Sequence, residues 1–77
     1  MNWKDEVKDP DEVKVFLAMD GPSHTWRTMA GIARQTGLTE GRVAQILAKH
    51  NLKLTRLSEA TSVSGSALVG LIEKVGA

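Results

Sequence analysis

The residues of this 77-residue chain that could do chemistry are its charged side chains, because it has no cysteine and only two histidines, His24 and His50. A zinc site needs three or four closely spaced His, Cys or carboxylate ligands, and no such set can be assembled around these histidines. The sequence also lacks a nucleophile–base pairing and a glycine-rich phosphate loop. We therefore expect no catalytic residues, no metal and no cofactor, and we predict that the protein is not an enzyme.

Basic side chains gather in the middle of the chain, although the formal net charge is only +1. Residues 1–20 hold three basic and six acidic side chains, residues 21–57 hold six and one, and residues 58–77 hold one and two. The middle block therefore has a balance of +5. Such a local positive field attracts polyanions, nucleic acids among them. The alternative is that these are ordinary solvated charges.

The length and composition indicate one small domain without a membrane span. No apolar run approaches the ~20 residues that would cross a bilayer. The start "MNWKDEVKDP" is acidic and lacks the apolar core of a signal peptide. Absence of cysteine fits a reducing compartment. We expect a cytoplasmic protein with no membrane contact, made of an N-terminal extension over residues 1–8 and one domain over residues 9–77.

The first expected helix begins at "DPDE", residues 9–12. Asp9 can cap it, Pro10 suits its first position, and Glu12 can reach back to the Asp9 N–H in a capping box. The helix then continues to Met19. The segment "HTWRT", residues 24–28, follows as a short extended segment with Trp26 buried.

The stretch from Ala30 to Leu47 resembles one long helix interrupted at Gly37. Glycine just past a helix end accepts the left-handed conformation that closes it, and Thr39 can cap a second helix. Two short helices joined by a tight turn form a helix-turn-helix. On a helical wheel, the second helix buries its apolar residues and exposes Gly41, Gln45 and Ala48, flanked on one side by Arg42 and Lys49 and on the other by Ala44.

Beyond Asn51 the pattern changes to two strand-like segments, "LKLTRLSEA" and "ALVGLIEKV", with Gly65 near the hairpin tip. We expect Leu52 and Leu54 to face inward, with Leu57 a further candidate. Leu68, Gly70 and Ile72, or their neighbours, should face inward from the second strand, depending on register. A helix over "LVGLIE" is the competing interpretation.

The order helix–strand–helix–helix–strand–strand predicts an α+β fold, mainly α with a small β-hairpin. From about Asp9 to Val75 the chain resembles the winged helix-turn-helix family, on the spacing of Ile32, Ala33, Gly37 and Val43 together with the hairpin. The segment "WRTMAGIARQTGLTEGRVAQIL" is also similar to winged-helix modules attached to larger bacterial proteins.

The resemblance implies a DNA-binding module, of the kind found in transcription regulators, that reads the major groove with the helix over residues 40–50. Arg42, Gln45 and Gly41 would then be the base-reading candidates. Six further residues would contact phosphates and set the orientation on the duplex: Arg27, Thr28, Thr39, Lys49, Lys53 and Arg56. A domain this small would need a homodimer or a larger host protein for tight specific binding.

Two features favour the alternative, a module that binds another protein or domain and not DNA. No lysine or arginine occurs from Leu57 to Glu73, so the predicted wing is uncharged or acidic. Gly41, Ala44 and Ala48 also leave the exposed helix face small and shallow, which suits a partner helix as well as DNA. A fold does not fix a function.

Overall fold

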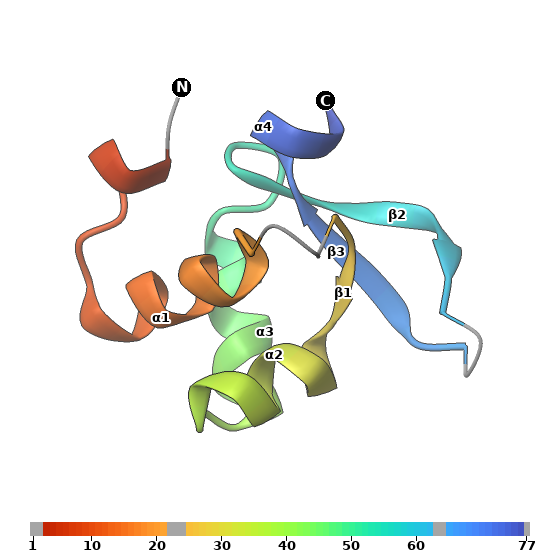
Figure 1. The fold of residues 1–77 in the computed structure, drawn as a ribbon, viewed down its shortest axis with the longest axis horizontal. Coiled ribbons are helices and arrows are strands. Elements are labelled where there is room, and N and C mark those ends of the chain that lie inside the picture. Colours follow the sequence, from red (N-terminus) through yellow and green to blue (C-terminus); the bar gives the residue numbers. More distant parts are fainter. Residues whose placement is uncertain (1–2, 22–24, 63–64, 77) are drawn as a thin grey trace.

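The computed structural model describes residues 3–21, 25–62 and 65–76. In chain order its elements are the 3₁₀ helix η1 (Trp3–Asp5), α1 (Pro10–Met19), β1 (Arg27–Thr28), α2 (Met29–Thr36), α3 (Glu40–Lys49), β2 (Thr55–Thr61), β3 (Ala67–Leu71) and α4 (Ile72–Val75) (Figure 1). Figure 1 shows the three longer helices grouped beside a twisted sheet. The predicted mixed α+β class is therefore confirmed.

Helix α1 begins where the sequence predicted. The Asp9 side chain accepts hydrogen bonds from the backbone N–H groups of Asp11 and Glu12, and Pro10 occupies the first helical turn, where its missing N–H has no intrahelical partner to lose. The helix ends at Asp20, whose N–H bonds back to the carbonyl of Phe16.

The chain reverses at Gly37 as predicted. Gly37 has φ 80°, in the left-handed region, and its N–H donates to the Ala33 carbonyl, which closes α2. The hydroxyl of Thr39 then accepts from the Arg42 N–H and caps α3. The interruption thus converts one run of helix-forming residues into two packed helices.

The three strands form an antiparallel sheet in the order β1–β3–β2. Thr55 is paired with Leu71 and Leu57 with Val69, so these four side chains share the face that meets the helices. Val69 and Leu71 are buried, so the inward residues of β3 are the neighbours of Leu68, Gly70 and Ile72. The pairing becomes irregular between Leu57 and Thr61, where a β-bulge interrupts the ladder.

Two details of the predicted hairpin are wrong. Leu52 does not face inward: it precedes β2 in a turn and is 78% exposed, whereas Leu54 is buried. The second strand ends at Leu71, and residues 72–75 form a helical turn. This turn brings Val75 back over Gly70, where a Cβ would lie 3.0 Å from the Val75 Cγ1 atom, so it covers a part of β3 that a longer strand would leave open.

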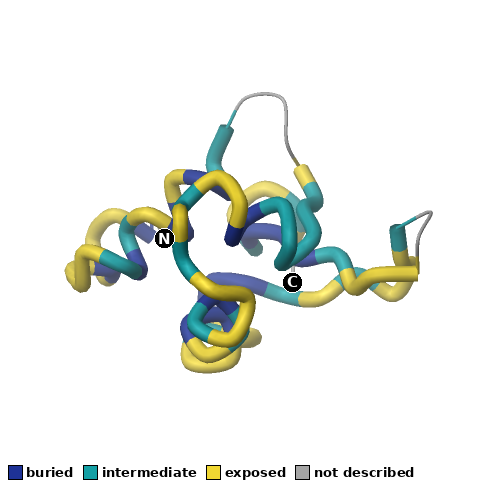
Figure 2. Tube along the Cα trace, turned by 90° about the horizontal axis from the view of Figure 1, so that it is seen from below, coloured by how far each residue is buried: buried dark blue, intermediate teal, exposed yellow. Residues whose placement is uncertain are grey.

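The core lies where α1, α2 and α3 meet the sheet, and Figure 2 shows the buried stretches of chain gathered there. Phe16, Ile32, Val43 and Val69 are essentially inaccessible to solvent. They are joined by Leu54 from the turn before β2 and by other apolar side chains of the same elements: Val15, Ala18, Met19, Ala33, Ile46, Leu47 and Leu71.

Residues ahead of α1 also contribute to this core. Trp3 and Val7 are buried, and the Trp3 ring lies 5.3 Å from the Phe16 ring, centroid to centroid. The Trp3 indole N–H donates to the Asp20 carboxylate at 3.1 Å. The segment before Asp9, predicted as an extension, therefore packs onto the domain that follows it.

Candidate functional site

Helix α3 presents the faces that the helical wheel predicted. Val43, Ile46 and Leu47 are buried, whereas Gly41 and Gln45 are exposed. What this exposed face can bind depends on the charged groups beside it and on the direction in which they extend.

Arg42, the predicted guanine reader, extends toward the start of α1. Its Nε lies 3.4 Å from Asp11 Oδ2, and its Nη2 lies 3.8 Å from Asp9 Oδ1. Its Nη1 donates to the Oε1 of Gln45 at 2.7 Å. Arg42 therefore binds two carboxylates and Gln45, the second base-reading candidate. The third candidate, Gly41, has no side chain to read a base.

Lys49 is paired with a buried acid. Its Nζ lies 2.8 Å from Glu12 Oε2, while His50 Nε2 lies 2.7 Å from Glu12 Oε1. The predicted capping box is wrong for this reason: the Glu12 carboxylate turns toward α3, away from its own helix start. Burial raises the pKa of Glu12. The hydrogen bonds from Lys49 and His50 and the charges of these residues lower it by more in total, so the pKa lies below its ordinary 4.5.

Four of the five remaining phosphate candidates are also engaged within the chain. Arg27 donates to the Ala18 carbonyl at 3.1 Å and to the Gln35 side chain. The Arg56 guanidinium lies 5.7 Å from the centre of the Trp26 ring and donates to the Gly76 carbonyl at 3.4 Å. The hydroxyls of Thr28 and Thr39 cap α2 and α3, accepting from Gly31 and Arg42.

Lys53 and Arg34 differ from this pattern, since within residues 3–21, 25–62 and 65–76 neither side chain forms an ion pair. Lys53 lies in the turn after α3, and Arg34 lies on α2. The +5 charge balance of the central block is thus offset locally by the acidic start of α1 beside α3.

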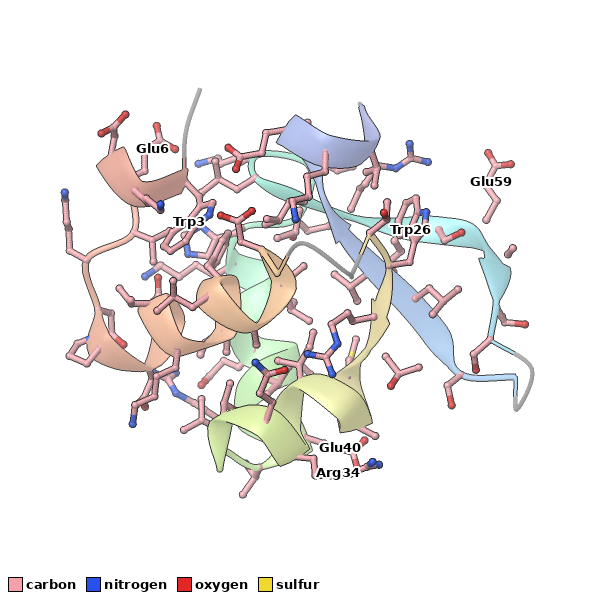
Figure 3. All side chains as sticks on the ribbon, viewed as in Figure 1. Trp3, Glu6, Trp26, Arg34, Glu40 and Glu59 are labelled. Carbon is pink, nitrogen blue, oxygen red and sulfur yellow. The ribbon has the colours of Figure 1, made fainter. Side chains whose placement is uncertain are left out.

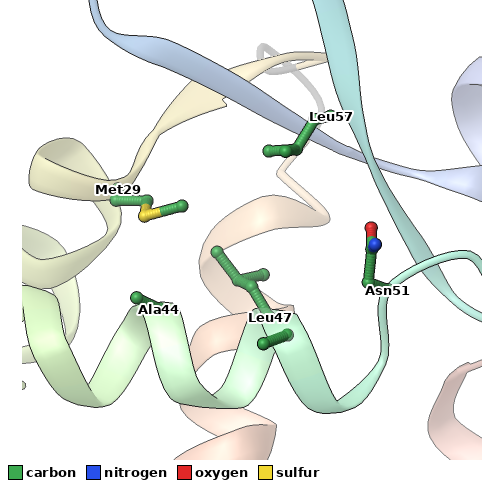
Figure 4. Close-up of a pocket in the computed structure, with 6 residues that line it drawn as sticks. Met29, Ala44, Leu47, Asn51 and Leu57 are labelled. Atoms are coloured by element: carbon green, nitrogen blue, oxygen red, sulfur yellow. The ribbon is translucent and has the colours of Figure 1, made fainter.

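The other flank of α3 is apolar and hollowed. Met29, Ala44, Leu47, Ala48, Asn51 and Leu57 line an open hollow of about 170 Å³. Figure 4 shows Leu57 reaching from β2 toward Leu47 and Ala44 on α3, with Met29 at the side. Leu57 is 49% exposed, so this leucine is shared between the core face of the sheet and the surface.

Two further hollows adjoin this one. The hollow at the start of α3, about 240 Å³, shares Met29 with it and is also lined by Glu40 and Ala67. The hollow beyond the end of α3, about 400 Å³, shares Asn51 and Leu57 with it. We call these three adjoining hollows the α3 trough. It is lined by α3 residues from Glu40 to Ala48, continues past Asn51 beside β2 as far as Glu59, and has residues of β2 and β3 as its other wall.

Leu52, which lines the far hollow of the α3 trough, has an unusual backbone conformation and an exposed side chain. It is the one described non-glycine residue with positive φ, at 67°, a conformation that costs a residue with a Cβ roughly 1–2 kcal/mol. Its side chain is nevertheless a large apolar one that the fold leaves in solvent. A residue that is strained in its backbone and exposed in its side chain contributes little to the fold, which makes it a candidate for binding.

Sequence reasoning missed the α3 trough. Leu57 lies two residues after Thr55 along β2, so the two-residue period of a strand indicates its face, but the outward position of Leu52 has no signal in residue type. Within the described residues there is no group of three side chains suited to a metal ion. No described helix combines the length and the apolar character that crossing a bilayer requires.

Comparison of the chain with protein-family models, with curated proteins and with solved structures finds no match.

Proposed function

We propose that this chain is a winged helix-turn-helix module that binds another protein or domain through the α3 trough. The reversal at Gly37 and the hairpin after α3 support the family assignment. The observation that carries the function is the contrast between the two flanks of α3. One flank holds its cations against α1 carboxylates, and the other exposes Leu52 and Leu57 beside small side chains.

Exposed apolar surface with a polar rim is typical of interaction sites. DNA binding needs cations that can leave their partners and contact phosphates. If Lys49 moved to a phosphate, the buried carboxylate of Glu12 would lose one of its two partners and would stay paired only with His50. Burying an incompletely paired charge is unfavourable, so the pairing opposes transfer of Lys49 to a phosphate.

Photo-crosslinking tests the proposal directly. A benzophenone side chain at position 57 should give a discrete, nuclease-resistant protein product in cells that carry the chain. The same group at position 17 is the matched control, because Leu17 is 55% exposed but lies on α1. Identical products from both positions, or a nuclease-sensitive product from position 57, would contradict the proposal.

DNA binding is the second candidate function, favoured by Lys53 and Arg34, which form no ion pair with the described part of the chain, and by the helix-turn-helix arrangement. One substitution separates the two candidates. Ala48→Lys adds a cation to the exposed side of α3 and to the wall of the α3 trough. It should weaken docking of an apolar partner, whereas it should strengthen binding to duplex DNA in a salt-dependent manner.

A further inference from the structure

We infer that the occupant of the α3 trough is an amphipathic α-helix of a partner protein, with one apolar face and a lysine or arginine near each end of that face. This inference rests on the proposed function. It identifies the chemistry of the partner.

Each of the two outer hollows carries a carboxylate. Glu40 lines the hollow at the start of α3, and Glu59 lines the hollow beyond its end. Figure 3 labels both side chains, which come from α3 and from β2. Within the described residues neither carboxylate forms an ion pair. Arg56 also lines the far hollow and keeps its charge, but it alternates with Leu57 along β2 and extends over the Trp26 ring on the opposite face of the sheet. Complementary charges on an occupant are therefore positive and lie toward its two ends.

The α3 trough has the shape and length that a short helix needs. Its apolar centre lies beside α3, whose 10 residues extend about 15 Å at 1.5 Å per residue, and its far hollow continues past the end of α3. A partner helix of similar length would place apolar residues at i, i+3 or i+4, and i+7 along it. Ala44 and Ala48 have short side chains, which permit two helices to approach closely.

An extended segment fits less well. Addition of a strand needs a regular sheet edge, and the β2 ladder is regular only to Leu57 because the bulge follows it. A second copy of this chain fits less well too. The start of its α1 carries Asp9 and Asp11 near the surface, which would bring carboxylates toward Glu40 and Glu59.

A displayed library of helical peptides with randomised surface positions, selected on the folded chain, provides the test. We expect the enriched peptides to share an apolar face and a basic residue near each end, and to shift the amides of Ala44, Ala48 and Leu57. Their affinity should fall about tenfold or more in Ala48→Lys, which blocks the apolar centre. Glu40→Gln with Glu59→Gln should weaken binding and remove the preference for basic ends.

Leu52→Gly is the variant that separates binding from folding, since glycine relieves the positive φ and removes an exposed side chain. This variant should bind the enriched peptides more weakly, while its free energy of unfolding should not fall. Enriched peptides with acidic ends, without helical periodicity, or shifting amides elsewhere would overturn the inference, and so would a library that yields no binder. If crosslinks from position 57 persist in that case, the proposed function stands and only the helical, basic-ended occupant is wrong. If crosslinks are absent as well, the proposed function fails.

Discussion

The Nζ atom of Lys49, at the end of α3, lies 2.8 Å from the Oε2 atom of Glu12 on α1. Thirty-seven residues separate the two in sequence. Because Glu12 is only 5% exposed, this pair joins a surface cation to a nearly buried acid and fixes the position of α3 against α1.

Glu12→Gln should therefore destabilise the fold. It removes the charge that pairs with Lys49 and His50, and we expect the free energy of unfolding to fall by about 1–3 kcal/mol in urea titrations. Asp11→Asn is the matched control, because Asp11 pairs with Arg42 at the surface, where an ion pair contributes about 0–1 kcal/mol. Equal losses in the two variants would show that burial of Glu12 has no energetic consequence.

The same pair predicts how stability depends on pH. Folding lowers the pKa of Glu12 below 4.5, so the folded state favours the ionised carboxylate. Its contribution is present above the pKa of the unfolded chain and is lost as pH falls through the lower pKa of the folded state. The stability difference between the natural chain and Glu12→Gln should shrink as pH falls below 4.5. A stability difference that grew as the pH fell would mean that folding raises the pKa of Glu12.

Gly70→Ala should strain the outer face of the sheet. A Cβ at this position would lie 2.9 Å from the Trp26 ring, closer than carbon atoms pack. Overpacking of this kind costs about 1–3 kcal/mol, measurable as a lower urea midpoint. Combining it with Trp26→Leu should cost less than the sum of the two single variants, because the smaller side chain relieves the clash. Simple additivity would mean that the ring does not oppose the new methyl group.

The turn at Gly37 offers a direct test of the helix break. Gly37→Ala places a Cβ on a backbone with φ 80° and should cost about 1–2 kcal/mol, although the space around it is open. Gly41→Ala is the control within α3, where alanine is favoured over glycine by up to about 1 kcal/mol. The two alanine variants should shift the thermal midpoint in opposite directions. A stabilising Gly37→Ala would be incompatible with a left-handed residue at this turn.

Leu52→Gly, unlike Gly37→Ala, should not destabilise the fold. Positive φ suits glycine, so relief of strain should offset the greater entropy of the unfolded chain, and the free energy of unfolding should stay within about 0.5 kcal/mol or rise. Leu54→Gly is the contrast two residues away, because Leu54 is buried and its loss should cost more than about 2 kcal/mol. Similar losses at both positions would place the Leu52 side chain in the core.

The parts of the fold that the sequence predicted are those whose signals are local. The Gly37 turn, the Asp9 cap and the Thr39 cap each depend on residues within a few positions of one another. The partners of Arg42 and Lys49 lie 31 and 37 residues away, and only tertiary packing brings them together. That is why the cationic flank of α3 looked available to DNA in the sequence. The bulge after Leu57 had no comparable signal, so the wall of the α3 trough could not be derived either.

The central claim is that α1 carboxylates hold the cations of α3 and leave its open face to a protein. Titration of the ¹⁵N-labelled chain with mixed-sequence duplex DNA at low salt tests it most directly. We predict no saturable amide shifts over residues 39–49 up to about 0.1 mM DNA, the weak end of non-specific affinities. Saturable shifts focused on Thr28 and residues 39–49 that weaken steeply with added salt would contradict the claim.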